Sequence, residues 1–170
     1  MNVETIMTRE VKTCRPNDTL DIPTRLMWEN DCGCVPVVDD ERHVLGMITD
    51  RDICMAAWTQ GGRLSEMRVS GAFSKPSHTC TADATLDAAE QIMRNKQIRR
   101  LPVVDEQRRL VGLLSLNDVA RVAADGGRKV GAGEAVTPNE VAETLAVVGR
   151  PRAGTLREYA TAGGADMRRA

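Results

Sequence analysis

The sequence predicts an α+β fold made of two copies of one small unit, followed by a short C-terminal extension. The 170 residues repeat at an offset of 66 without a gap, and residues 36–39 and 102–105 are both Pro-Val-Val-Asp. In each copy, short apolar runs and stretches of helical apolar spacing give the order strand-helix-strand-strand-helix. A unit of about 60 residues has a marginal core when it stands alone. We therefore expect the copies to pack with pseudo-twofold symmetry and to carry two related clefts along their shared surface.

The elements of the first copy follow from its turn residues and its apolar spacing. An extended stretch is expected over residues 11–14, before the turn residues Arg-Pro-Asn-Asp. Apolar residues then recur at helical spacing over 20–30, where a proline is acceptable because it falls near the first turn. Apolar runs at 35–38 and 44–49 predict two antiparallel strands, since only a short polar turn joins them. A second helix is predicted over 50–59, before a Gly-Gly pair.

The second copy repeats this order and is followed by a segment that has no counterpart in the first. Its expected elements are a strand at 78–80, a helix at 86–96, strands at 101–104 and 110–115, and a helix at 117–124. We divide the chain into repeat 1 (1–65), repeat 2 (66–125) and a C-terminal extension (126–170). Within the extension, Thr-Pro-Asn-Glu at 137–140 is typical of a helix start and predicts a short helix over 138–148. The remaining residues are expected to form a mobile tail.

Composition excludes several classes of function. The net charge of −1 argues against a large phosphate-binding surface of the DNA-binding kind. The aromatic residues Trp28, Trp58, Phe73 and Tyr159 are too few for a base-stacking platform. We therefore expect no nucleic-acid partner. The N-terminus shows no signal-peptide pattern and no stretch approaches the ~18 apolar residues of a membrane span, so we expect a soluble, cytoplasmic protein without a membrane partner.

The five cysteines are an odd number, and a reducing compartment would keep them as thiols. Cys32 and Cys34 have the one spacing suggestive of zinc binding, but no second Cys or His pair completes a site. Their repeat equivalents are Ile98 and Arg100, so metal ligation is not part of the repeated unit. We interpret these residues as half-buried thiols and predict no metal site. A metal or redox role stays the alternative, and thiol titration with and without zinc would test it.

Two matching segments, residues 46–52 and 112–118, place a hydroxyl at a strand-to-helix junction and a carboxylate three residues later. A helix N-terminus offers free N–H groups and a partial positive charge, which suit a phosphate. The carboxylate lies one turn in on the same side, where it can accept hydrogen bonds from both hydroxyls of a ribose. Apolar residues at 35–37 and 101–103 can hold a flat base beside it. The combination suggests a nucleotide site.

A helix cap is the competing interpretation of the same residues. Ser or Thr followed three residues later by an acidic residue is a capping arrangement. Thr49, Asp52, Ser115 and Asp118 would then only stabilise two helix starts. Duplication copies a cap as readily as a ligand site, although a capping box more often has Glu or Gln than the shorter Asp. The residues alone leave both interpretations open.

Taken in order, these segments resemble a stand-alone pair of CBS domains, an arrangement called a Bateman module. The resemblance covers about residues 3–124. The segments that carry it are 3–8 (Val-Glu-Thr-Ile-Met-Thr), 36–39, 46–52 (Gly-Met-Ile-Thr-Asp-Arg-Asp), 99–105 (Arg-Arg-Leu-Pro-Val-Val-Asp) and 112–118 (Gly-Leu-Leu-Ser-Leu-Asn-Asp). Each is short, but their order and spacing, found twice, are specific.

The resemblance implies a flat disc with two clefts that bind AMP, ADP, ATP or S-adenosylmethionine, with no cofactor required. It assigns the hydroxyl and the ribose-binding carboxylate to Thr49 and Asp52 in one repeat and to their equivalents in the other. It also implies that two such modules pair into a homodimer through their helices. The binding residues that it indicates are Thr13, Thr49, Asp52, Thr79, Arg99, Arg100, Ser115 and Asp118.

Repeat 1 departs from the family pattern before its Val-Pro-Val strand. It has Cys-Gly-Cys at 32–34, where repeat 2 has the phosphate-contacting segment with Arg99 and Arg100. Phosphate affinity is therefore expected to differ between the clefts, with Arg51 as a substitute in repeat 1. The two arginines of repeat 2 also fit an ordinary solvated basic patch, so their role stays open.

These features predict a regulatory module rather than an enzyme. The sequence shows no nucleophile-base pair, metal cluster or paired carboxylates for catalysis. Binding of an adenine nucleotide would shift the repeats, or the dimer, between arrangements that an effector protein of unknown identity reads. The alternative is a dimeric interaction scaffold whose clefts bind no ligand.

Overall fold

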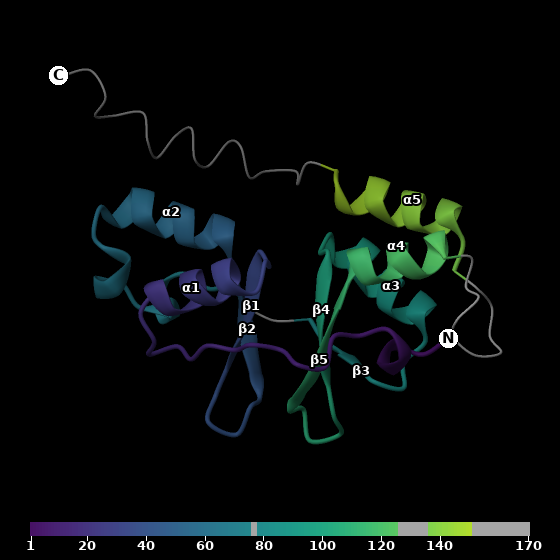
Figure 1. The fold of residues 1–170 in the computed structure, drawn as a ribbon, viewed down its shortest axis with the longest axis horizontal. Helices are drawn as coiled ribbons and strands as arrows, with labels where there is room; N and C mark the ends of the chain where they lie inside the picture. Colours follow the sequence, from purple (N-terminus) through teal and green to yellow (C-terminus); the bar gives the residue numbers. More distant parts are fainter. Residues whose placement is uncertain (76–77, 126–135, 151–170) are drawn as a thin grey trace, which may run out of the picture.

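The computed structural model describes residues 1–75, 78–125 and 136–150, and it shows two similar units side by side (Figure 1). Each unit has an antiparallel hairpin near the centre of the molecule and two helices farther out. The first unit contains α1 (Asp21–Glu29), β1 (Cys34–Val38), β2 (Val44–Thr49) and α2 (Asp50–Gln60). The second contains β3 (Cys80–Thr81), α3 (Leu86–Lys96), β4 (Arg100–Val104), β5 (Leu110–Ser115) and α4 (Leu116–Ala124). The predicted α+β class is confirmed.

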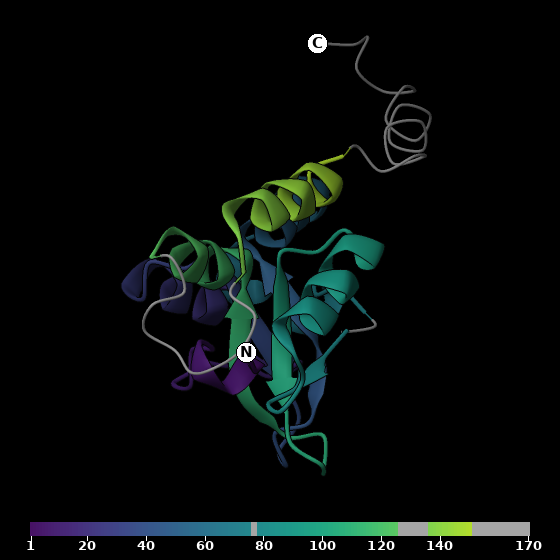
Figure 2. The same ribbon diagram turned by 90° about the vertical axis from the view of Figure 1, so that its right-hand side faces the viewer.

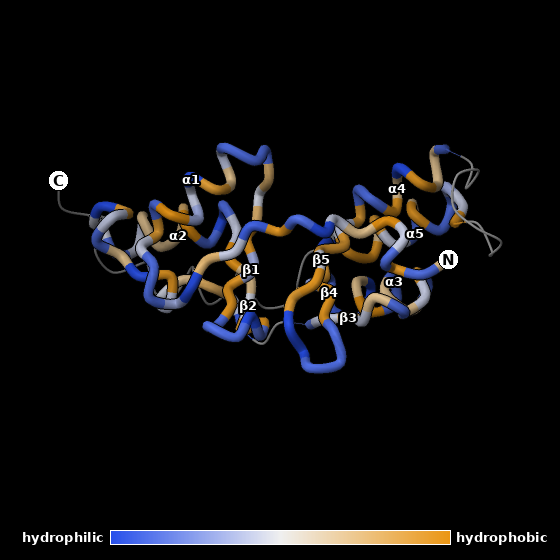
Figure 3. The backbone as a smooth tube through the Cα atoms, turned by 60° about the horizontal axis from the view of Figure 1, so that its bottom comes forward, coloured by the Kyte–Doolittle hydropathy of each residue, from blue (hydrophilic) through white to orange (hydrophobic). Residues whose placement is uncertain are grey.

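The two hairpins share their register and their irregularities. Cys34 lies opposite Thr49 in the first hairpin, and Arg100 lies opposite Ser115 in the second. Both have a bulge near the end of the first strand, and both turns contain an arginine with positive φ. The strands are strongly apolar and the turns are hydrophilic (Figure 3), because the strands are buried and the turns face water.

The strand expected before each first helix is shorter than the sequence predicts. Over residues 11–14, the prediction of a strand was wrong, because Cys14 forms only a single bridge with Val37. The chain turns immediately afterwards, since Asp18 accepts a hydrogen bond from the backbone N–H of Arg15 at 2.8 Å. In the second unit, β3 begins two residues later than predicted and pairs in parallel with β4.

The segment that opens each repeat packs into the core of the other repeat. Val3 and Met7 belong to the apolar cluster of the second unit, whereas Val69 and Phe73 belong to that of the first. Thr8 exchanges two backbone hydrogen bonds of 2.9 Å with Leu113. The equivalent residues of the other half, Ser74 and Met47, do the same at 2.9 and 3.3 Å. This exchange ties the two repeats together through their cores.

Gly46 and Gly112 allow this exchange because the opening segment crosses directly over them. A Cβ atom at Gly46 would overlap the ring of Phe73 and the carbonyl oxygen of Ser74. At Gly112 it would lie 2.5 Å from the sulfur of Met7. Both contacts are closer than ordinary Cβ contacts, so a side chain at Gly46 would displace the backbone of the crossing segment, whereas one at Gly112 would first displace the side chain of Met7.

The C-terminal extension contributes helix α5 (Pro138–Val148). It begins after Thr137, whose hydroxyl accepts from the N–H of Glu140 at 3.3 Å, while the Glu140 carboxylate accepts from the N–H of Thr137 at 2.7 Å. α5 lies across α3 and α4 (Figure 2) and adds Val148 to the core of the second unit. The mobile tail expected after residue 150 lies outside the described residues.

Candidate functional site

The hydroxyl-carboxylate pairs predicted from the sequence lie at the N-termini of α2 and α4. Both N-cap residues have extended backbone angles and a reciprocal capping box. Asp52 accepts from the Thr49 N–H at 2.9 Å, and the Thr49 hydroxyl accepts from the Asp52 N–H at 3.2 Å. The corresponding distances for Ser115 and Asp118 are 2.8 and 3.3 Å. The capping interpretation is therefore correct for both pairs, whatever further role they have.

The cap engages one oxygen of each carboxylate and leaves the other to its surroundings. Oδ2 of Asp52 also accepts from the Thr49 hydroxyl at 2.7 Å, and Oδ2 of Asp118 accepts from the Ser115 hydroxyl at 2.5 Å. Oδ1 of Asp118 pairs with Arg121. Oδ1 of Asp52 accepts no hydrogen bond from the residues that the structure describes. Capping and ligand binding are thus compatible at Asp52, because different oxygen atoms would serve them.

Arg100 reaches from the second repeat to the start of α2 in the first. A Cβ atom placed on Gly33 would lie 3.5 Å from Nη2 of Arg100 and 3.1 Å from Oδ2 of Asp50. Burial raises the pKa of Cys34 to about 11, and the nearby positive charge of Arg100 opposes that rise. Cys34 and Arg100 are repeat equivalents, so they meet where the two halves face each other. Arg100 is therefore a cation at the junction of the repeats.

The remaining predicted cations are also available. Arg51 and Arg99 are exposed, and within the described part of the chain neither their side chains nor that of Arg100 has an ion pair. Arg99 directly precedes β4, and its carbonyl accepts the N–H of Leu116 at 2.9 Å. This geometry leaves their charges free for an anion, without selecting between phosphate binding and a solvated patch.

Thr13 and Thr79 lie at equivalent, half-buried positions beside the central strands. Their neighbours Cys14 and Cys80 pair in parallel with β1 and β4. Among the described residues, no hydrogen bond joins either threonine hydroxyl to the capping pairs, so their contact with a nucleoside stays a prediction.

Sequence reasoning missed Arg121, although an arginine three residues after an aspartate in a helix is a recognisable ion-pair spacing.

None of the cysteines belongs to the group of possible metal ligands found among the described residues. Cys14, Cys34 and Cys80 are buried, and burial raises the pKa of Cys14 to about 12 and that of Cys80 to about 11. A low-pKa thiolate, which metal binding favours, is therefore not prepared at these positions. The prediction that Cys32 and Cys34 are half-buried was wrong for both residues: Cys34 is buried because it lies within β1, and Cys32 is exposed.

Three potential metal ligands do gather in the first hairpin turn, namely Asp39, Glu41 and His43. Nδ1 of His43 lies 2.9 Å from Asp39, and in the second hairpin Arg109 lies 2.9 Å from Asp105 at the equivalent place. The Asp39–His43 contact thus occupies the place of the Asp105–Arg109 ion pair in the second hairpin turn. Among the described helices, none has the length and apolar character needed to cross a bilayer.

Comparison with known proteins places this geometry in a family. The family model for the CBS domain matches residues 3–58 and 69–125, which is most of the chain and both repeats. The chain belongs to the CBS-domain family. As a tandem CBS protein it is similar to the CBS domain-containing protein YhcV of Bacillus subtilis, with 41% identity over 120 residues that cover 70% of this chain and 83% of YhcV.

Solved structures of CBS pairs have the same fold. Hypoxic response protein 1 of Mycobacterium tuberculosis is 32% identical over 117 residues, covering 68% of this chain and 80% of that protein. Its crystal structure, with two coordinated zinc ions, matches at a TM-score of 0.64 and 30% identity over 71% of this chain and 98% of that one. CBSX2 of Arabidopsis thaliana in complex with AMP matches at a TM-score of 0.65 and 24% identity, over 75% of this chain and 98% of that one. An identity this low shows the fold alone.

Proposed function

We propose that this CBS pair is a regulatory module that binds an adenosine-containing nucleotide in the clefts between its repeats and signals to a partner protein. The observation that carries the proposal is the divided use of the Asp52 carboxylate. Oδ2 caps α2, whereas Oδ1 accepts no hydrogen bond from the described residues. Asp52 is half-buried, and a carboxylate oxygen that accepts no hydrogen bond from the protein is suited to the two hydroxyls of a ribose.

Positive charge near the repeat junction supports the phosphate part of this proposal. Arg100 lies near the N-terminus of α2 without an ion pair among the described residues, and a helix N-terminus attracts anions. Asp50 lies on the same side and would repel a highly charged phosphate chain. The geometry therefore favours AMP, ADP or S-adenosylmethionine over ATP at this cleft. The AMP complex of a protein with the same fold agrees with an adenosine ligand.

The exchanged opening segments provide a route from the cleft to a partner. Because each repeat carries part of the core of the other, a ligand between them must act on both. A nucleotide that binds one arrangement of the repeats more tightly shifts the population towards that arrangement. The effector protein then reads the shifted surface, and the chain needs no catalytic step of its own.

The second candidate is a scaffold whose clefts remain without ligand. It is favoured by the complete reciprocal caps at α2 and α4, which already give both hydroxyl-carboxylate pairs a structural role. The third capping box, at the start of α5, shows that this chain uses the same device away from the repeat junction. Ligand binding decides between the two candidates.

Thermal unfolding of the full chain with AMP, ADP, ATP and S-adenosylmethionine is the deciding experiment. A ligand at 100 times its dissociation constant stabilises by about 2.7 kcal/mol if it binds only the folded state, which raises the Tm by several degrees. If the protein is a nucleotide sensor, Asp52→Asn should abolish the rise in Tm that the ligand causes. Glu140→Gln is the matched control, because it alters the capping box of α5 and leaves the clefts unchanged. No shift with any of these ligands supports the scaffold.

A further inference from the structure

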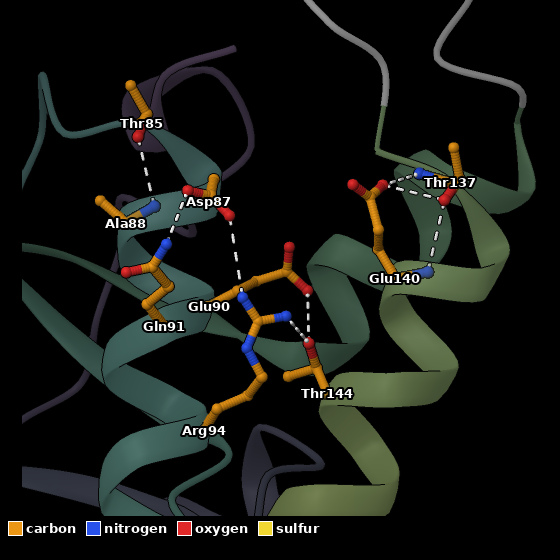
Figure 4. A network of polar contacts seen from close by, with 9 residues as sticks. All are labelled: Thr85, Asp87, Ala88, Glu90, Gln91, Arg94, Thr137, Glu140 and Thr144. Atoms are coloured by element: carbon orange, nitrogen blue, oxygen red, sulfur yellow. Dashed lines mark hydrogen bonds and ion pairs between the residues drawn. The ribbon is translucent and has the colours of Figure 1, made fainter.

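Helix α5 covers a face of α3 whose counterpart in the first repeat is open within the described residues. Thr144 of α5 is fully buried, and its hydroxyl donates to Glu90 at 3.0 Å and accepts from Arg94 at 3.1 Å (Figure 4). The repeat equivalents of Glu90 and Arg94 are Thr24 and Trp28. Trp28 is 88% exposed, whereas the Arg94 side chain beside α5 is 25% exposed. The C-terminal extension thus covers on the second repeat what the first repeat presents openly.

A groove of about 630 Å³ lies on this open face, and Thr24 and Trp28 belong to its lining. Its apolar lining comes from α1, α2 and the segment after α2, with Met27, Ile53, Ala57 and Leu64. The Trp28 side chain stands at the groove almost wholly in water. An apolar groove beside an exposed aromatic side chain is typical of a surface that another segment covers.

The charged side chains that line the groove are both acidic. They are Asp31 and Asp50, and neither has an ion pair within the part of the chain that the structure describes. Arg100 lies near Asp50 but does not pair with it. A segment that combines apolar side chains with positive charge would therefore complement this groove.

Residues 151–170, which follow α5, have this chemistry. They contain four arginines against one glutamate and one aspartate. Leu156, Tyr159 and Ala160 have the i, i+3, i+4 spacing of an apolar helix face. Thr-Leu-Arg-Glu at 155–158 also repeats the Thr-x-x-Glu pattern that begins α5. A Gly-Gly pair ends this pattern after about two turns, and so short a helix is marginal unless an apolar surface supports it.

We propose that residues 155–162 dock as a short helix in the α1–α2 groove of the same chain. Leu156 and Tyr159 enter the apolar groove, and Arg157 lies at its edge beside the acidic lining. The C-terminal extension then covers one helical face on each repeat, with α5 on the second and this segment on the first. The proposal replaces the mobile tail that composition alone suggests for these eight residues.

The path of the chain makes this docking reachable. Figure 1 shows that α5 ends on the side of the second unit that faces the first, and that α2 begins on the facing side of the first unit. Residues 151–156 can span about 20 Å when extended. A short tether of this kind also gives the segment an effective concentration on the order of millimolar at a groove within its reach. A partner protein that uses the groove would first have to displace the segment. This inference goes beyond nucleotide binding and does not depend on it.

Alkylation of the cysteines in the full chain tests the proposal. Cys32 and Cys54 line the groove and are exposed in the described structure, whereas the other three thiols are buried. We expect Cys32 and Cys54 to react about tenfold faster in Tyr159→Glu than in the wild type, because the substitution places a charge on the docking face. Thr161→Glu is the matched control. It adds the same charge on the opposite side of the predicted helix and should leave the rates unchanged.

The rates, followed by mass spectrometry, also separate the possible occupants of the groove. Docking within one chain gives protection that does not depend on protein concentration. Protection that increases with concentration and persists in Tyr159→Glu would mean that a second copy covers the groove, and would overturn the proposal. Equal rates in the wild type and Tyr159→Glu would overturn it too, as would an equal gain in both variants.

Trp28 gives a second readout that needs no chemical modification. The chain has two tryptophans, so Trp58→Phe leaves Trp28 as the single one, and Trp58 is 70% exposed, which makes this background mild. A docked segment should shield Trp28 from acrylamide and shift its emission to shorter wavelength. Adding Tyr159→Glu should remove both effects, whereas Thr161→Glu should keep them. Emission and quenching typical of a water-exposed tryptophan in the Trp58→Phe background itself would overturn the proposal.

Discussion

Arg121 forms an ion pair with Oδ1 of Asp118, and the first repeat has no equivalent of this contact. The residue that corresponds to Arg121 is Met55, and Oδ1 of Asp52 accepts no hydrogen bond from the described residues. Asp118 is also the more buried of the two carboxylates, with 7% exposure. The two hydroxyl-carboxylate pairs are therefore chemically different, and under the proposed function a ligand at Asp118 would compete with Arg121.

This difference predicts that Arg121→Met strengthens nucleotide binding at the second cleft. Arg121 is largely exposed, so its ion pair is worth at most about 1 kcal/mol, which corresponds to about fivefold in affinity. Isothermal titration calorimetry with AMP should show a stronger second binding event. The reciprocal change, Met55→Arg, should weaken the first event by a similar factor. Identical isotherms for the wild type and both variants would contradict the proposed roles of the two carboxylates.

The crossing of Phe73 over Gly46 predicts a large loss of stability in Gly46→Ala. The added methyl group would overlap the phenyl ring and the Ser74 carbonyl, and overpacking of this kind costs about 1–3 kcal/mol. Urea unfolding should show a lower midpoint. Gly71→Ala is the control, because a Cβ there would have no atom within 4 Å. Equal midpoints for the two variants would mean that the opening segments do not cross as described.

Removal of the Thr49 hydroxyl should affect both stability and binding. Thr49→Ala removes the N-cap of α2 and is expected to cost about 1 kcal/mol in the free energy of unfolding. Thr137→Ala removes the same type of cap from α5 and serves as the comparison. If Thr49 contacts the ligand, only Thr49→Ala weakens nucleotide binding beyond its effect on stability. Equal affinities of the two variants would restrict Thr49 to its structural role.

Local patterns in the sequence predict the helices and hairpins well. The span of α3 and that of β5 are as predicted, because apolar spacing and turn residues act over a few positions. The Thr-Pro-Asn-Glu pattern likewise indicates the start of α5. The extended stretch at 11–14 forms only a single bridge, between Cys14 and Val37. The chain turns directly after it, because the N–H of Arg15 donates to Asp18 and not to a neighbouring strand.

Contacts between distant residues could not be predicted in the same way. The exchange that places Val3 in the second core and Phe73 in the first depends on packing across the whole chain. Gly46 and Gly112 are visible as repeats, but the reason for glycine appears only when the crossing segment is placed. For the candidate site, the sequence indicates the hydroxyl-carboxylate pairs, whereas the difference between their free oxygens depends on side-chain geometry.

The buried carboxyl group of Glu90 makes the contact between α3 and α5 dependent on pH. Burial raises the pKa of Glu90, although the Thr144 hydroxyl and the Arg94 charge oppose this rise and Glu140 and Asp87 add to it. The folded protein therefore holds the proton more tightly than the unfolded chain does. The resulting stabilisation is present below the pKa of an unfolded Glu, about 4.3, and is lost as the pH rises through the higher pKa of the folded state.

Glu90→Gln keeps the shape of the protonated side chain and removes this loss. The variant should melt a few degrees above the wild type at neutral pH, and the difference should shrink as the pH falls towards the unfolded pKa. Thermal unfolding measured across this range checks the prediction, with Glu143→Gln on the exposed part of α5 as the control. If Glu90→Gln instead melts lower at neutral pH, the attraction between the charged carboxylate and Arg94 outweighs the cost of burial and helps to hold α5 on the second repeat.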